Sequence, residues 1–140
     1  MCRWADPEWF EKTQFYYEQA LRAKRTVGAV FQYAYFLQKH NQFSKAQRLY
    51  EEALKIYRAP AAENPSAYLP DVAVTLINLS ISYLQAVPEK EKSIAAAQEA
   101  IELLLPFYQQ APYLQKYREA AFGVLKENGV DVESFPSEGR

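Results

Sequence analysis

The sequence predicts an all-α protein of about six helices arranged as three antiparallel pairs. Three observations predict this class. The chain of 140 residues contains 4 Gly against 11 Tyr, 8 Phe and 2 Trp, whereas a β-rich domain normally uses more glycine in its turns. Apolar residues recur at steps of three and four along most of the chain. Proline, asparagine and glycine interrupt these periodic runs at regular intervals, as helix ends do.

The first half of the chain predicts three helices and then a long connection. The first predicted helix covers residues 7–25. Asp6, directly before it, can accept hydrogen bonds from free amides, and Pro7 suits the first helical position. A second periodic run covers residues 27–40 and is broken at Asn41, and a third covers 44–57. Three prolines in residues 58–71 then predict a segment without continuous helix.

The second half predicts three further helices, each separated from the next by proline. One covers residues 72–86, and Pro88 separates it from a helix over 89–105. Pro106 is expected to end or kink that helix. The last predicted helix covers residues 112–128, since Pro112 can open it and Asn128–Gly129 is a good left-handed cap. We therefore predict one domain over residues 1–129 and a loosely ordered tail over residues 130–140.

Composition narrows the partners and the compartment. With 16 Lys+Arg against 17 Asp+Glu, the chain has no basic excess to neutralise phosphates, so nucleic-acid binding is not expected. The single cysteine, Cys2, cannot form an internal disulfide, which fits a reducing compartment. The first residues lack the apolar region of a signal peptide, and the apolar stretches are shorter than the roughly 20 residues of a membrane span. We expect a soluble, cytoplasmic protein that does not bind membranes.

An internal repeat organises these helices. When Ala34 is placed over Ser80 and Ala121, with spacings of 46 and 41 residues, packing positions coincide in the three copies. The matched pairs of the first two copies are Val30 and Leu76, Tyr33 and Leu79, and Leu37 and Tyr83, while Tyr50–Leu54 matches Ala97–Ile101. Small residues let the two helices of a hairpin approach, and larger ones fill the space between hairpins.

This pattern resembles the tetratricopeptide repeat (TPR). Its motif positions are occupied here by Val30, Tyr33, Ala34, Leu37, Asn41, Phe43, Ala46, Tyr50, Ala53 and Leu54. The second copy is closer still over residues 76–83, and residues 17–21 resemble the end of an earlier repeat. Residues 53–79 are similar to the long repeats of the kinesin-light-chain-like subgroup, which is common in large bacterial repeat proteins. The resemblance covers roughly residues 13–128 and implies an α-solenoid of stacked hairpins.

No constellation of residues predicts catalysis. His40 is the only histidine, and it has no metal-ligand or acid–base partner at suitable spacing, so we expect it to be solvated at a helix C-terminus. Cys2 has no neighbouring base. Asn78-Leu79-Ser80 matches a glycosylation pattern but lies within a predicted helix, where modification is not expected. We therefore predict no enzyme activity, no metal and no cofactor.

The resemblance implies a concave groove lined by the first helix of each pair. The groove positions of the motif correspond to Phe31, Gln32, Tyr35, Gln38 and Lys39 in the first copy, Ile77, Asn78, Ile81 and Gln85 in the second, and Arg118 and Phe122 in the third. Such a surface suits an extended or helical peptide, because apolar anchors supply affinity and polar groups set the register. The alternative is that Phe31, Tyr35, Ile77 and Ile81 pack inside the same chain.

The predicted function is a protein-interaction scaffold that binds a protein or peptide segment. Asn78 matches one position of the family's carboxylate clamp, but Phe31 and Tyr35 occupy places of its basic residue and its asparagine, so no clamp is expected. The half-repeat at the start leads us to expect a longer array. Two alternatives stay open: a homodimer formed through exposed terminal helix faces, and a ligand-responsive regulatory module of a larger protein.

Overall fold

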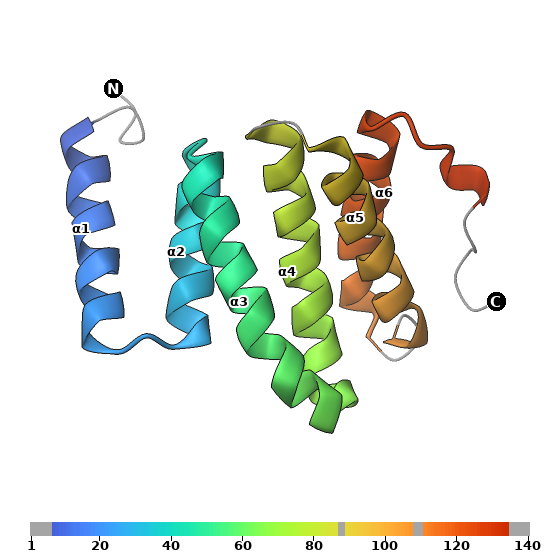
Figure 1. Ribbon diagram of the computed structural model, residues 1–140, viewed down its shortest axis with the longest axis horizontal. Helices are drawn as coiled ribbons and strands as arrows, with labels where there is room; N and C mark the ends of the chain where they lie inside the picture. Colours follow the sequence, from blue (N-terminus) through green and yellow to red (C-terminus); the bar gives the residue numbers. More distant parts are fainter. Residues whose placement is uncertain (1–6, 87–88, 108–110, 135–140) are drawn as a thin grey trace.

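The computed structural model describes residues 7–86, 89–107 and 111–134. Within this part of the chain the regular structure is entirely helical, and each helix lies antiparallel to its neighbours (Figure 1). The helices succeed one another across the molecule as α1 (Pro7–Ala23), α2 (Val27–Lys39), α3 (Phe43–Glu63), α4 (Pro65–Gln85), α5 (Lys90–Leu104) and α6 (Gln115–Glu127). The predicted all-α class of stacked helical hairpins is confirmed.

The connection predicted between the third and fourth helices is wrong. α3 continues to Glu63 with Pro60 inside it, and α4 already begins at Pro65, so only Asn64 separates the two helices. A proline inside a helix removes one backbone hydrogen bond, whereas a proline at the first position removes none. Ala61 is buried in the core between these helices, and tertiary packing of this kind outweighs the local loss.

Two helix ends were predicted at residues that adopt left-handed backbone. Asn41, after α2, has φ 64°, and Gly129, after α6, has φ 80°. Beyond Gly129, the Val130 amide donates to the Leu125 carbonyl at 2.9 Å, which closes the last turn of α6 in the Schellman arrangement. Pro106 lies in a 3₁₀ turn directly after α5, so it ends that helix as expected.

The hydrophobic core consists of two clusters with different residue types. The first lies between α1, α2, α3 and the end of α4 and is aromatic, with Tyr33, Phe36 and Tyr50 among its buried residues. The second lies between the end of α3, α4, α5 and α6 and is rich in alanine, with Ala97 and Ala100 fully buried. Small side chains let α4 and α5 approach closely, whereas aromatic rings fill a wider space between α1 and α2.

The hairpins are joined by the same tyrosine–glutamate hydrogen bond at two successive junctions. The Tyr33 hydroxyl donates to Glu18 Oε1 at 3.0 Å, and the Tyr83 hydroxyl donates to Glu51 Oε2 at 2.9 Å. Glu18 and Glu51 each follow a tyrosine in the similar segments 17–21 and 50–54. We call these junctions between hairpins the seams. Their recurrence shows that the internal similarity of the sequence corresponds to repeated contacts.

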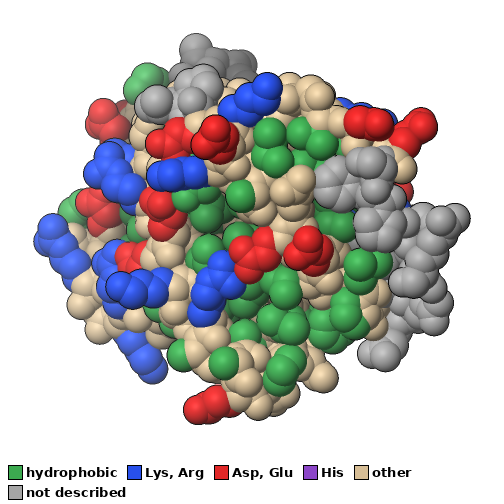
Figure 2. Space-filling model, turned by 45° about the vertical axis from the view of Figure 1, so that its right-hand side comes forward, with side chains coloured by type: hydrophobic (Ala, Val, Ile, Leu, Met, Phe, Trp, Pro, Cys, Tyr) green, Lys and Arg blue, Asp and Glu red, His purple; other side chains and the backbone are tan. Residues whose placement is uncertain are grey.

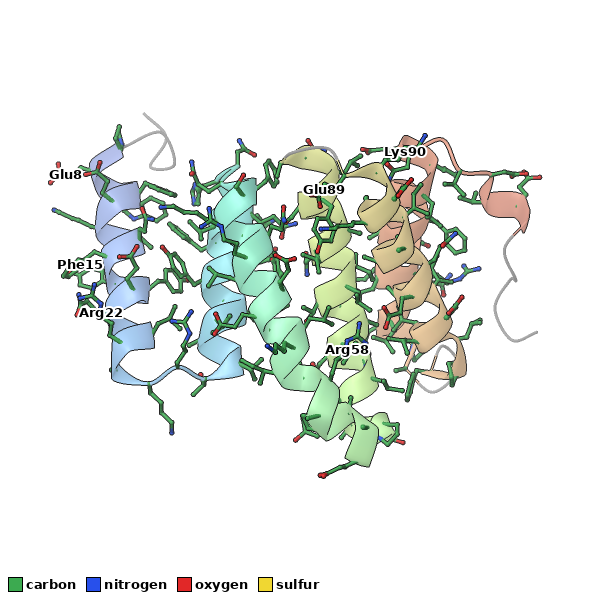
Figure 3. All side chains as sticks on the ribbon, viewed as in Figure 1. Glu8, Phe15, Arg22, Arg58, Glu89 and Lys90 are labelled. Atoms are coloured by element: carbon green, nitrogen blue, oxygen red, sulfur yellow. The ribbon has the colours of Figure 1, made fainter. Side chains whose placement is uncertain are left out.

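An arginine–glutamate pair recurs at the same two seams. Arg25 binds Glu52 through two hydrogen bonds of 2.6 and 2.7 Å. Arg58, labelled in Figure 3, binds Glu99 through two hydrogen bonds of 2.8 and 3.2 Å. The side-chain hydrogen bond from Arg25 lowers the pKa of Glu52 below its usual value. Figure 2 shows charged side chains of both signs beside hydrophobic ones on one face of the molecule.

A chain of buried polar groups connects α4, α5 and the end of α6. The Ser93 hydroxyl donates to the Ser80 carbonyl at 2.8 Å. The amide nitrogen of Asn128 donates to the Ser93 hydroxyl and to the Val124 carbonyl, both at 3.0 Å. Ser80 and Ser93 are fully buried, and each group in this chain finds a partner, as buried polar groups must.

His40 lies at the C-terminal end of α2, but the prediction that it is simply solvated is wrong. The residue is half-buried. The centroid of its ring lies 4.7 Å from the ring centroid of Phe36, 5.3 Å from that of Phe10 and 5.5 Å from that of Trp9. The reason is that α1 packs across α2 and brings its own aromatic residues to the helix end. His40 therefore belongs to the aromatic cluster that holds α1 in place.

Both ends of the chain are described only in part. Cys2 and Asp6 lie outside the described residues, as do Pro88 and the last part of the tail, residues 135–140. In the described part of the tail, Val132–Ser134 form a short 3₁₀ helix. Val130 and Val132 are half-buried and pack against the alanine-rich cluster.

α4 is the one described helix that is long and apolar enough to cross a membrane by length and composition alone. It passes this test because it begins at Pro65 and so extends beyond the predicted apolar stretch. Half of its most apolar stretch is buried inside the protein, and α3, α5 and α6 pack against the helix. The central helix of a globular core has the same properties, so α4 does not indicate a membrane span.

Candidate functional site

A groove on the described surface is formed mainly by α2, α4 and α6. In Figure 1, α3 lies in front of α2 and α5 in front of α6, so this groove faces the other way. Its volume is about 700 Å³. The residues that line it are Phe31, Gln32, Tyr35, Gln38, Lys39, Phe43, Val74, Ile77, Asn78, Ile81, Lys116, Tyr117 and Ala120. We call this set the α2–α4–α6 groove.

The structure brings most of the predicted site residues together in this groove. Eight of the eleven line it: Phe31, Gln32, Tyr35, Gln38, Lys39, Ile77, Asn78 and Ile81. They come from two helices that are separated by the whole of α3 in the sequence. Their convergence on one surface follows from the hairpin arrangement, because the first helices of successive hairpins lie next to each other. Whether they bind a ligand stays a prediction.

The wall contributed by α2 is supported from below by a tyrosine of the core. The fully buried Tyr50 packs edge-on against Phe31, with ring centroids 5.4 Å apart, and its hydroxyl donates to Gln38 Oε1 at 2.7 Å. Burial, and after it the neighbouring Tyr35, raises the pKa of Tyr50 far above its usual value, so this donor stays protonated. Phe31 and Gln38 are therefore held in fixed positions at the surface of the groove.

Tyr35 and Lys39 form the exposed rim on the α2 side. Tyr35 is 42% exposed, and the ammonium of Lys39 lies 5.1 Å from the centre of its ring. An exposed aromatic ring with a cation over one face still offers its edge and other face for contact. Among the described residues, Tyr35 belongs to neither of the two core clusters.

The α4 wall is a row of side chains at helical spacing. Ile77 is buried, with 2% exposure, while Ile81 is half-buried and packs against the alanine-rich cluster. The amide nitrogen of Asn78 donates to the Val74 carbonyl at 3.1 Å. Internal packing therefore accounts for Ile77 and partly for Ile81, but not for Tyr35.

Three of the predicted residues do not line the groove. Gln85 is exposed at the C-terminal end of α4. Arg118 and Phe122 contact each other on α6, with the guanidinium 4.8 Å from the ring centre, and Phe122 packs against the alanine-rich cluster. The α6 positions that do face the groove are Lys116, Tyr117 and Ala120. α6 is thus rotated relative to the register that the repeat alignment gives.

Sequence reasoning also missed two lining residues outside α6. Val74 lies one turn before Ile77 on α4, so extending the row of groove positions backwards would have found it. It was missed because the helix was expected to begin only shortly before it. Phe43 is the first residue of α3 and carried no groove signal in the motif.

The chemistry of the groove favours binding rather than reaction. Its charged lining residues are Lys39 and Lys116, and no carboxylate or cysteine lies among those that line it. Over residues 7–86, 89–107 and 111–134, no group of three or more His, Cys, Asp or Glu side chains is placed to hold a metal ion. Aromatic and aliphatic walls with amide and ammonium groups at the rim match the composition of peptide-recognition surfaces.

No family model, curated protein or solved structure matches this chain.

Proposed function

We propose that the protein is a TPR-like interaction scaffold that binds a peptide segment of a partner protein in the α2–α4–α6 groove. The observation that carries the proposal is the exposed Tyr35 above a groove whose other α2 residues are fixed by Tyr50. Rigid aromatic anchors give affinity at low entropic cost, and such anchors dominate the energetics of interfaces. The repeated seam contacts and the internal sequence similarity support the TPR-like assignment.

The first experiment selects ligands from a displayed random-peptide library with the purified chain as bait. A selected peptide is then synthesised with a fluorescent label. Its Kd is measured by fluorescence anisotropy for the unmodified protein, Tyr35→Ala and Tyr16→Ala. Tyr35→Ala should weaken binding by at least about tenfold, which is ~1.4 kcal/mol and typical of an anchor residue.

The matched control is Tyr16→Ala, which removes the same side chain from the exposed surface of α1, where Tyr16 is 70% exposed. This variant should bind as the unmodified protein does. If both variants weakened peptide binding equally, or if neither weakened it, binding in the groove would be contradicted.

The proposal does not include a carboxylate clamp. The groove offers Lys39 and Lys116 at its rim, but the amide nitrogen of Asn78 already donates to its own helix. A fluorescent peptide ending in Glu-Glu-Val-Asp is therefore expected to bind weakly, and amidation of its terminus should change little. Tight binding that is lost on amidation would show that a clamp exists.

A second candidate function, self-association, is favoured by the outer side of α1. Phe15 and Tyr16 are 54% and 70% exposed there, and Figure 3 shows Glu8, Phe15 and Arg22 on the side of α1 that faces away from α2. Glu8 and Arg22 lie at equal intervals on either side of Phe15. Two copies packed antiparallel about Phe15 would therefore bring opposite charges together.

Sedimentation velocity over a concentration series tests self-association. The dimer predicts a sedimentation coefficient that rises with concentration and a return to the monomer value in Phe15→Glu. A monomer at the highest concentration would remove this candidate and leave the groove proposal unaffected.

A further inference from the structure

A smaller pocket opens beside the α2–α4–α6 groove. It has a volume of about 260 Å³ and shares Phe31, Gln32, Val74 and Tyr117 with the groove, so the two hollows adjoin each other. Its remaining lining residues are Gly28, Tyr57, Pro70, Asp71, Thr75, Tyr113 and Leu114. We call it the Asp71 pocket, because Asp71 is the only charged residue among those that line it.

The walls of this pocket are aromatic. Phe31 from α2, Tyr57 from α3, Tyr113 from the 3₁₀ turn before α6 and Tyr117 from α6 line the same pocket as the Asp71 carboxylate. Tyr113 is 65% exposed, so its ring lies at the mouth rather than in the core. Aromatic rings and a carboxylate that line one pocket can both attract a cation, the rings through their faces and the carboxylate through its charge.

The Asp71 carboxylate lacks a compensating partner within the described residues. The residue as a whole is exposed, and partial burial of its carboxyl group is the cause that raises its pKa. The Thr75 hydroxyl donates to the backbone carbonyl of Asp71, at 2.8 Å, and not to its side chain. The pKa of Tyr57 is raised by burial first and by the charge of Asp71 second, which indicates that the two groups are near each other.

A positive charge already contacts one of these rings from outside the pocket. The Lys116 ammonium, which lines the larger groove, lies 5.0 Å from the centre of the Tyr117 ring. This contact places one cation against a ring that lines both the pocket and the groove. Lys116 is not among the residues that line the Asp71 pocket, so the carboxylate is left for a cation supplied by a ligand.

We propose that the Asp71 pocket binds the guanidinium group of an arginine side chain in the peptide that occupies the groove. The proposal rests on the proposed function and names one feature of its ligand. A guanidinium suits the site better than an ammonium, because it is planar, stacks on tyrosine faces and can bind a carboxylate through two hydrogen bonds. Since Lys39 and Lys116 line the adjoining groove, an acidic or neutral stretch next to this arginine fits the charges of the surface.

The pocket is tested first without any peptide, by amide NMR titration of the full chain. The probe is N-acetyl-arginine methylamide, and the neutral analogue of the same shape is N-acetyl-citrulline methylamide. We expect saturable shifts of the Gly28 and Gln32 amides with the arginine probe and at least about fivefold weaker binding of the citrulline probe. Equal binding of the two probes would overturn the proposal.

Asp71→Asn keeps the size of the side chain and removes its charge, so it should weaken the arginine probe by at least about fivefold and leave the citrulline probe unchanged. Asp131→Asn is the matched control, because that residue lies outside the pocket and an amide oxygen can still accept from the Glu133 amide. Tyr113→Ala removes one wall at an exposed position, so it tests the pocket even if Asp71→Asn reduces stability. Unchanged binding in both Asp71→Asn and Tyr113→Ala would contradict the assignment.

The displayed peptide library separates this proposal from the groove itself. Selected peptides should contain arginine at one fixed position, and this preference should disappear when Asp71→Asn is the bait. Peptides that depend on Tyr35 but show no arginine preference would refute the pocket and leave the groove intact. If arginine-containing peptides are selected that are insensitive to Tyr35→Ala, the pocket stands and the groove proposal fails.

Discussion

Tyr50 and Tyr35 show how the same residue type serves two regions of this molecule. Tyr50 is fully buried, donates its hydroxyl to Gln38 and supports the ring of Phe31. Tyr35 is 42% exposed on the adjoining groove surface and is contacted by Lys39. Aromatic residues of the core and seams are thus explained by packing and satisfied hydroxyls. An aromatic residue that packing does not explain, such as Tyr35, is the one that points to binding.

The largest expected effect follows directly from this contrast. Tyr50→Ala should lower the free energy of unfolding by about 3–5 kcal/mol, since it removes a fully buried aromatic side chain from the core. Tyr35→Ala should change it by less than about 0.5 kcal/mol. Urea denaturation followed by circular dichroism measures both values. Similar losses in the two variants would show that Tyr35 belongs to the core.

A second, smaller effect concerns the buried polar chain of the alanine-rich cluster. Ser93→Ala removes the hydroxyl that joins the Ser80 carbonyl to the Asn128 amide, which leaves a buried carbonyl without this donor. We expect a loss of about 1–3 kcal/mol in the free energy of unfolding. Ser44→Ala, at an exposed position on α3, is the control and should cost far less. If Ser93→Ala left the free energy of unfolding unchanged, the buried hydrogen bonds of Ser93 would contribute nothing to the junction of α4, α5 and α6.

Alkaline pH should weaken the aromatic seam between α1 and α2. Burial is the main cause that raises the pKa of Tyr33 to about 12, and Glu18 contributes as well. Because the folded-state pKa lies above the unfolded value of about 10, this stabilisation is complete below about pH 10 and is lost as the pH rises toward 12. Tyr33→Phe should reduce the fall in the free energy of unfolding over this interval. Tyr16→Phe, at an exposed position, should not, and the same slope in both variants would count against the assignment.

The smallest expected effect concerns the exposed ion pair between α3 and α5. Removing Arg58, Glu99 or both in a double-mutant cycle should give a coupling energy of at most about 1 kcal/mol, decreasing with added salt. The bidentate geometry joins two hairpins, but both side chains remain in contact with water. A coupling energy that is large and independent of salt would require a more buried pair than the structure contains.

The sequence predicted the helical class and most groove residues because these depend on local periodicity and on the repeat. Asn41 and Gly129 were found as helix ends because their left-handed backbone conformation favours asparagine and glycine. The prediction was wrong at Pro60 and Pro70, because both lie inside helices. The packing of α3 against α4 compensates for the hydrogen bonds that these prolines remove.

The Asp71 pocket could not be predicted, because it depends on that same correction. Tyr57 and Asp71 were placed at the two ends of a non-helical connection, whereas both lie within helices that face each other. The register of α6 was missed as well. The alignment placed Arg118 and Phe122 toward the groove, but Phe122 packs against the core, and this brings Tyr117 to the surface of the groove.

Site-specific photo-crosslinking reports directly on which surface of the protein contacts a bound peptide. Tyr35 and, in a separate protein, Tyr16 are replaced by benzoylphenylalanine, and each protein is irradiated with a peptide selected from the displayed library. We expect a covalent adduct from position 35, blocked by excess unlabelled peptide, and none above background from position 16. An adduct from position 16 alone, or none from position 35 under saturating peptide, would contradict the assignment of the α2–α4–α6 groove as the binding surface.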